Sequence, residues 1–295
     1  MRIIETALIL RKEIARLRTD GKRVAFIPTM GNLHDGHLAL IKEARNQADV
    51  VVVSVFVNPL QFPREDDLQR YPRTLQADCE KLSKAQVDLV YAPAVSDVYP
   101  HGLAHQTQVV VPPLLSQCDE PHQRTRLRGI ATVMCKLFNL VQPDIVFFGT
   151  NDHPRFLTIR RLIRDLNYDI ALATIPTVRE KTGLALSSCN TLLNKEEKEA
   201  APHLYQVMQT LADMIRERPS AIAESLDNAR DDLSRAGFRD ISLEICDADD
   251  LEAVRVNSEK AVILASAWLG NIRLIDCLHV NMPNPAVSET ASPSL

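Results

Sequence analysis

No stretch of this 295-residue sequence is long and apolar enough to cross a membrane as a helix. The most apolar run, Val50–Val57, is far shorter than the roughly 20 residues that a membrane helix needs. The apolar stretch Ala7–Leu10 is interrupted by the charged residues 11–13, so it is too brief for the apolar core of a secretion signal. The sequence therefore predicts a cytoplasmic protein with no membrane partner.

Blocks of positive charge and aromatic residues are also scarce. The chain carries 34 basic and 38 acidic residues, a formal net charge of −4, and 5% of its residues are aromatic. A dedicated nucleic-acid or membrane-surface binder concentrates basic residues on one face. No nucleic-acid partner is therefore expected, and any phosphate that the protein handles has to be bound by a local site.

Cysteine pairs of the C-x-x-C type are absent. The six cysteines are spread along the chain without a histidine-rich spacing beside them. Zinc sites and disulfide frameworks depend on such spacing, so neither is predicted, and the cysteines are interpreted as reduced thiols. With this length and 45% apolar residues, the chain is expected to form two domains without such staples.

Short β-branched runs alternate with helical patterns over residues 1–175. Val24–Ile27 is the first expected strand, residues 38–44 have apolar side chains at helical spacing, and Val50–Phe56 is continuously apolar, as a strand buried on both faces is. Further expected elements are strands at 88–91, 144–148 and 170–175 and a helix at 156–166. This order predicts an α/β domain with a Rossmann-like, doubly wound parallel sheet.

After Pro176 the pattern changes to helices followed by strands. Charge-rich helical stretches are expected at Lys195–Arg218 and Ala221–Ala236. Three expected strands follow, at Ile241–Cys246, Ala261–Ser266 and Ile272–Asp276. The order predicts a smaller α+β domain over residues 176–281, and the Pro-, Ser- and Thr-containing residues 282–295 are interpreted as a disordered tail.

Residues 28–37 (PTMGNLHDGH) join the first expected strand to its helix. Ligands of open α/β sheets bind beyond the carboxyl ends of strands, and a helix N-terminus offers free N–H groups to an anion. His34 and His37 share one face of a helix that begins near them, where they can donate hydrogen bonds to phosphate oxygens. Gly36 lets a ligand approach the backbone closely. This segment is therefore predicted to bind a nucleotide.

Two other interpretations of the histidine pair stay open from the residues alone. A His-x-x-His pair also occurs in metal sites, although only two ligands are in view here. The two side chains can instead cap the helix. The preceding turn Pro28–Gly31 favours the nucleotide, and the His-x-Gly-His element resembles the signature of the nucleotidyltransferase superfamily.

Ordered motifs along most of the chain resemble pantothenate synthetases, the pantoate–β-alanine ligase family. The resemblance spans about residues 1–280 and is carried by Arg23–Phe62, Tyr71–Leu75 with Asp78, Lys136–Asp144, Pro176–Glu180, Gly183–Ser188, Ala248–Leu251 and Arg273–Asp276. It implies an ATP- and magnesium-dependent homodimer in which a pantoate carboxylate attacks the α-phosphate of ATP. The amine of β-alanine then displaces AMP from the acyl adenylate.

The resemblance also implies roles for individual residues. Implied catalytic residues are His34, His37, Asp152, Ser187 and Ser188. Implied ATP contacts are Met30, Gly31, Gly36, His37, Gly149, Val178 and Ser187. Implied acid-substrate contacts are Pro28, Met30, Asn58, Gln61, Arg126 and Arg155. Asp152 is also the implied ligand of the magnesium ion.

Four positions in this implied site depart from the family pattern. The family usually has Gly-Glu-Lys-Asp-Tyr-Gln-Gln where residues 149–155 read GTNDHPR. The Lys that neutralises ATP phosphate is Asn151, and the first Gln, which binds pantoate, is Pro154. Cys189 replaces an Arg that clamps the phosphates, and Arg126 replaces a His near the pantoate site. Asn151 carries no charge, so it does not replace an ammonium beside a phosphate.

These departures leave three functional hypotheses. In the first, the chain is a working pantothenate synthetase in which Arg155, Arg126 or Arg124 supplies the missing charge. In the second, it is a diverged ligase or acyl transferase that acts on another acid or amine. In the third, it is a non-catalytic homologue that binds a small molecule or a protein. A further hypothesis makes Cys189 a nucleophile that carries a thioester. If the chemistry is retuned, we expect slow turnover of pantoate and β-alanine, and faster adenylate formation when Asn151→Lys and Cys189→Arg are combined.

Overall fold

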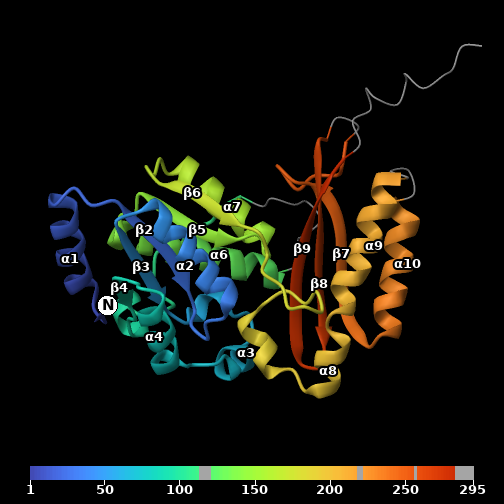
Figure 1. Cartoon of the computed structure of the whole chain (residues 1–295), viewed down its shortest axis with the longest axis horizontal. Helices are drawn as coiled ribbons and strands as arrows, with labels where there is room; N and C mark the ends of the chain where they lie inside the picture. Colours follow the sequence, from blue (N-terminus) through green and yellow to red (C-terminus); the bar gives the residue numbers. More distant parts are fainter. Residues whose placement is uncertain (113–120, 218–221, 256–257, 283–295) are drawn as a thin grey trace, which may run out of the picture.

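The computed structural model of the chain describes residues 1–112, 121–217, 222–255 and 258–282. In these residues the chain forms a six-stranded parallel sheet flanked by helices, and a three-stranded antiparallel sheet lies beside it (Figure 1). The predicted Rossmann-like α/β fold and the smaller α+β part that follows it are thereby confirmed.

The strands of the parallel sheet lie in the order β1-β4-β3-β2-β5-β6. Their bounds are β1 Arg2–Ile4, β2 Val24–Thr29, β3 Val50–Val55, β4 Leu89–Tyr91, β5 Ile145–Gly149 and β6 Ala171–Ile175. From β2 the chain proceeds to β3 and β4 on one side, and it later returns to β5 and β6 on the other side. The order therefore reverses between β2 and β5, the kind of switch point where ligands bind beyond the strand ends.

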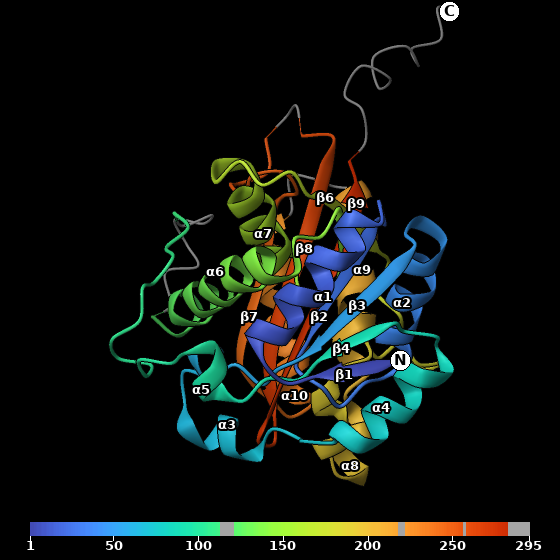
Figure 2. The same ribbon diagram turned by 90° about the vertical axis from the view of Figure 1, so that its left-hand side faces the viewer.

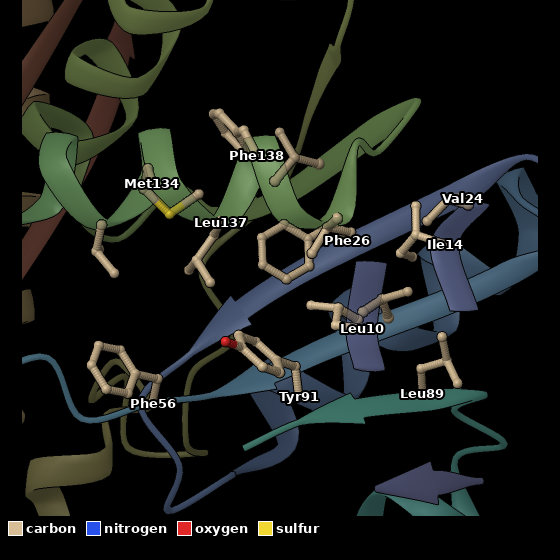
Figure 3. Packing of buried hydrophobic residues seen from close by; sticks show 14 of the residues in the cluster. Leu10, Ile14, Val24, Phe26, Phe56, Leu89, Tyr91, Met134, Leu137 and Phe138 are labelled. Carbon is tan, nitrogen blue, oxygen red and sulfur yellow. The ribbon is translucent and has the colours of Figure 1, made fainter. Parts of the chain in front are cut away.

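Helices cover both faces of this sheet, with α6 and α7 on one side of the strands and α2 and α4 on the other (Figure 2). The elements that connect the strands are α1 Ala7–Thr19, α2 Asp35–Gln47, the 3-10 turn η1 Pro59–Gln61, α3 Glu65–Arg70, α4 Leu75–Lys84, α5 Val95–Val98, α6 Pro121–Val141 and α7 His153–Asp165. Successive residues of β2 serve opposite cores: Phe26 shares one with Leu10 and Phe138 (Figure 3). Ile27 shares the other with Ile41.

The second sheet contains β7 Phe238–Asp247, β8 Lys260–Leu269 and β9 Ile272–Asn281, paired in that order. It is preceded by the 3-10 turn η2 Ser188–Leu192 and by α8 Lys195–Ala200, α9 His203–Glu217 and α10 Ile222–Arg235. The helices α9 and α10 cover one face of this sheet (Figure 1). The other face packs on Leu157 of α7 through Val262, Leu264 and Cys277. Helix α7 thus touches both sheets.

Some elements differ from their expected bounds. The helix expected at Lys195–Arg218 is two helices, because Pro202 lies between α8 and α9 and has no N–H to continue a helical hydrogen-bond ladder. The strands of the second sheet are longer than their apolar runs, since antiparallel pairing extends over polar residues on the outer face. The stretch Ala7–Leu10 is the first turn of α1, where the Thr6 hydroxyl accepts a hydrogen bond from the Ile9 amide at 3.4 Å.

Among the described residues no helix is both long and apolar enough to cross a membrane. We propose residues 1–175 and 176–281 as the two domains, since β6 ends at Ile175 and the second sheet has its own core. Residues 283–295 of the expected tail lie outside the described residues.

Candidate active site

The turn that follows β2 is held by Asp78 of α4. The carboxylate of Asp78 is fully buried and accepts hydrogen bonds from the amides of Asn32 at 2.9 Å and Leu33 at 2.8 Å. The Thr74 hydroxyl donates a third bond at 3.0 Å. Gly31 has a φ of 81°, where a side chain is strained, and a Cβ there would lie 3.1 Å from Asp78 Oδ2. These contacts fix the path of the chain from the end of β2 into α2.

His34 and His37 cap the first turn of α2, as the capping interpretation predicts. His34 Nδ1 accepts a hydrogen bond from the Gly36 amide at 3.2 Å, and His37 Nδ1 accepts one from the His34 amide at 3.3 Å. Burial lowers the pKa of His34 to about 4 and holds the pKa of His37 well below its usual value. Both rings are therefore neutral at pH 7, and a neutral ring that accepts through Nδ1 carries its proton on Nε2. Each ring thus has one Nε2–H donor left for a ligand.

A cavity of about 330 Å³ opens beyond the carboxyl ends of β2 and β5. The predicted site residues that line it are Pro28, Met30, His34, Gly36, His37, Asn58, Gln61, Arg126, Gly149, Asn151, Asp152, Arg155, Val178, Ser187, Ser188 and Cys189. Gly31 lies behind this lining in the turn described above, and Pro154 borders a neighbouring cavity. One space therefore collects the residues predicted for the nucleotide and for the acid.

Asn58 holds η1 at the end of the cavity that is predicted to bind the acid, which we call the acid end. It is 1% exposed, and its Oδ1 accepts hydrogen bonds from the Tyr99 hydroxyl at 2.8 Å and from the Leu60 amide at 3.3 Å. Its Nδ2 donates to the carbonyl oxygen of Gly129 in α6 at 3.1 Å. These bonds hold η1 against α6 and place Gln61, the last residue of η1, in the cavity lining.

Asp152 is the centre of a charged cluster at the start of α7. Its Oδ2 accepts from the two Nη atoms of Arg126 at 2.5 and 3.1 Å, and its Oδ1 accepts from the Arg155 amide at 3.2 Å. Burial alone raises the pKa of Asp152, but the guanidinium groups of Arg126 and Arg155 outweigh it and lower that pKa below its usual value. Asp152 is thus an ionised helix cap that is neutralised by arginine.

These residues do not fit magnesium held by the protein. Both oxygens of Asp152 already accept hydrogen bonds, and an arginine pair competes with a cation for the same lone pairs. No group of three or more His, Cys, Asp and Glu side chains in the described part of the chain is arranged to hold a metal ion. The metal interpretation of His34 and His37 gains no third ligand from this arrangement.

The departing residues Asn151 and Cys189 both line the cavity. The Cys189 amide donates to Ser187 Oγ at 3.3 Å, and burial raises the pKa of the Cys189 thiol. A protonated thiol is a poor nucleophile, so the burial of Cys189 disfavours a thioester there. Pro154 requires a correction: it borders the neighbouring cavity of about 100 Å³, whereas Arg155 faces the main cavity. The side chain of α7 available to a ligand in the main cavity is therefore that of Arg155.

Sequence reasoning missed five polar residues of the lining, Thr29, Ser54, Tyr71, Thr177 and Arg273. Ser54 is 1% exposed, and its hydroxyl has no hydrogen-bond partner among the described residues, so it is available to a ligand. The feature of the sequence that could have indicated Ser54 is its lone hydroxyl inside the apolar run Val50–Phe56. Tyr71 and Arg273 lie in motifs that carry the family resemblance, but no pattern in the sequence shows that they face the same space.

A doubly wound sheet with a helix N-terminus, two neutral histidines and arginines around one cavity defines a nucleotide-binding α/β enzyme. The family model described as pantoate-beta-alanine ligase matches residues 2–279, so the chain belongs to this family. Two crystal structures agree with this assignment. The pantothenate synthetase from Thermus thermophilus is 40% identical with a TM-score of 0.85, over 96% of this chain and 100% of that one. A pantoate-beta-alanine ligase from Francisella tularensis, complexed with beta-gamma ATP and beta-alanine, is 28% identical with a TM-score of 0.77, over 94% of this chain and 97% of that one.

Proposed function

We propose that the chain is an AMP-forming ligase that joins pantoate to β-alanine at the expense of ATP. Membership of the family supports this reaction, and the relative from Francisella was crystallised with beta-alanine and a nucleotide. The observation that carries the proposal is the single cavity in which the capped start of α2 and the η1 wall meet. A nucleotide bound at the start of α2 and a hydroxy acid bound at η1 would bring the carboxylate and the α-phosphate together.

In the first step a carboxylate oxygen of pantoate forms a bond to the α-phosphorus and pyrophosphate leaves. In the second step the amine of β-alanine attacks the acyl carbon, AMP leaves and the new amide loses a proton. His34 and His37 donate their Nε2–H groups to phosphate oxygens, and the α2 N-terminus adds its partial positive charge. The wall around Gln61 and Ser54 orients the acid by hydrogen bonds.

Magnesium, homodimer assembly and a cytoplasmic location belong to this proposal as expectations from the family resemblance. Because Asp152 is paired with arginine, we assign no protein ligand to magnesium and derive no step through it. The proposed substrates are small molecules, and the net charge of −4 gives no reason to add a nucleic-acid partner.

The test is product analysis with the purified chain, ATP, magnesium, pantoate and β-alanine, following AMP and pantothenate by mass spectrometry. Formation of both products in equal amounts supports the proposal. AMP formation with a different acid or amine from a panel would favour the diverged-ligase hypothesis instead. Nucleotide binding without turnover of any acid would favour the non-catalytic homologue.

A further inference from the structure

Positive charge in the cavity lining is concentrated on arginines near the start of α7. The charged residues of the lining are Arg126, Arg155, Arg273 and Asp152. With neutral His34 and His37, this lining has a net charge of +2. This net charge favours an anion in the cavity, and the three arginines differ in the hydrogen bonds that the described residues give them.

Arg126 and Arg273 have protein partners. Two Nη atoms of Arg126 bind the same oxygen of Asp152, and Arg273 donates to Ser266 Oγ at 2.9 Å. The side chains of Arg126 and Asp152 are 15% and 12% exposed, so this pair is largely shielded from water. The negative charge of Asp152 is therefore used mainly by Arg126.

The Arg155 guanidinium is only partly satisfied. Its Nε is buried without a hydrogen-bond partner among the residues that the structure describes, and it lies 3.8 Å from Asp152 Oδ2, beyond hydrogen-bond distance. The group lies over the Phe148 ring at 5.5 Å from the centroid, which orients it without removing its charge. A buried N–H with no partner costs free energy unless a ligand accepts its hydrogen bond.

Arg155 lines the same cavity as His37 and Gln61. It belongs to the first turn of α7, directly after β5, and its charge contributes to the low pKa of His37, after burial and His34. Asn151 lines the same cavity just before α7 and carries no charge. An anion in this cavity can therefore accept a hydrogen bond from Arg155 Nε, which is buried without a partner among the described residues.

We propose that Arg155 is the cation that binds the reacting α-phosphate and the attacking carboxylate in this chain, with Asp152 as its positioning residue. The inference rests on the proposed ligase function and concerns how this chain stabilises the adenylation step. Negative charge gathers at the α-phosphate as the carboxylate oxygen bonds to phosphorus and pyrophosphate departs. The N–H groups of Arg155 donate to these oxygens, and such a charge-assisted contact is worth about 10²- to 10³-fold in rate.

The experiment compares the wild type with Arg155→Gln, Arg155→Lys and the double variant Asn151→Lys/Arg155→Gln. Gln keeps an N–H donor on a shorter side chain but removes the charge, and Arg126 still neutralises Asp152 in every variant. The double variant returns a cation to the same cavity from the neighbouring position 151. Readouts are the kcat and KM of AMP formation, the calorimetric affinity for inorganic pyrophosphate, and the melting temperature.

We expect Arg155→Gln to lower kcat about 10²- to 10³-fold and to weaken pyrophosphate binding, with little change in melting temperature. Arg155→Lys should retain more activity than the Gln variant, and the double variant should regain at least about tenfold of the lost rate.

Rates within about threefold of wild type for Arg155→Gln would overturn the proposal. So would equal losses in the single and double variants together with a fall in melting temperature, because that pattern marks a structural role. A wild type without AMP formation contradicts the ligase function, and unchanged pyrophosphate affinity in Arg155→Gln then also rejects the anion site.

Discussion

At the scale of single residues, the histidines of α2 combine a structural and a chemical task. Each ring uses Nδ1 to cap the helix, and that hydrogen bond selects the tautomer whose Nε2–H is left for a phosphate. Burial keeps both rings neutral, so the donor persists across the physiological pH range. Helix capping, which competes with nucleotide binding as an interpretation of the sequence, is therefore compatible with the nucleotide site that we propose.

The low pKa of His34 predicts a loss of stability in mild acid. The unfolded chain takes up a proton at His34 near pH 6.5, whereas the folded chain does so only near pH 4. Between these values the unfolded state binds more protons, so the free energy of unfolding falls as the pH is lowered. His34→Asn keeps an accepting cap and does not titrate. Urea unfolding at pH 7 and pH 5 should show a smaller loss for His34→Asn than for the wild type, and equal losses would contradict this account.

Asp78 offers a second test at the same scale. Asp78→Ala removes the acceptor of the Asn32 and Leu33 amides inside a buried turn. Each of the two unsatisfied buried donors costs about 1 to 3 kcal/mol, so the free energy of unfolding should fall by about 2 to 6 kcal/mol. Chemical denaturation measures this change. A loss below about 1 kcal/mol would mean that water replaces the carboxylate and that the turn does not depend on it.

At the scale of elements, the acid end of the cavity depends on the close approach of α6 to η1. A Cβ on Gly129 would lie 2.0 Å from the carbonyl oxygen of Leu60, which belongs to rigid backbone. The same glycine offers its own carbonyl oxygen to Asn58. Glycine at position 129 therefore sets the distance between the helix and the turn that presents Gln61.

Gly129→Ala should displace η1 and impair the acid site while sparing the nucleotide site. We expect the KM for pantoate to rise at least about tenfold, because a misplaced binding group loses a contact worth about 1.4 kcal/mol or more. The affinity for ATP, measured by calorimetry in the absence of the acid, serves as the internal control because α2 lies apart from the α6–η1 contact. Parallel weakening of both affinities would indicate general unfolding instead.

Element order was predictable because β2, β3 and β5 bury apolar residues on both faces, and such strands read as continuous apolar runs. The place of residues 28–37 was predictable for a similar reason, since the segment follows the strand β2 and opens the helix α2. The direction of the side chains at the start of α7 could not be predicted, because it depends on the residue at which the Asp152 cap begins the helix. That one detail turns Arg155 into the main cavity and Pro154 out of it.

At the scale of the whole molecule, the segment that begins α7 joins the two sheets. His153 Nε2 lies 2.8 Å from the carbonyl oxygen of Ala248, and the Cys277 thiol donates to the carbonyl oxygen of Thr150. Leu157 packs against the second sheet. The residues that carry Asp152 and Arg155 are thus held from both sides, so a shift of the second sheet changes the cavity directly.

A second connection between the sheets is the ion pair of Arg179 with Asp276 of β9. Arg179 follows β6, and its guanidinium binds both oxygens of Asp276, at 2.5 and 2.9 Å, while it lies 3.7 Å from the centroid of the Tyr205 ring in α9. Asp276 is 4% exposed. Burial raises the pKa of this carboxyl above its usual value even with the opposing charge of Arg179 beside it, so its ionised form depends on Arg179.

Arg179→Ala should destabilise the chain far more than the net worth of the ion pair. Removing one partner leaves a buried carboxylate without its counter-charge, which costs about 3 to 5 kcal/mol. The double variant Arg179→Ala/Asp276→Asn removes the charge as well, so it should recover most of that loss, apart from the packing of Arg179 on Tyr205. Urea unfolding of both variants, with Asp276→Asn as the third corner of the cycle, separates the two contributions. If the double variant is as unstable as Arg179→Ala, the buried charge is not the cause, and the contact with Tyr205 anchors the second sheet instead.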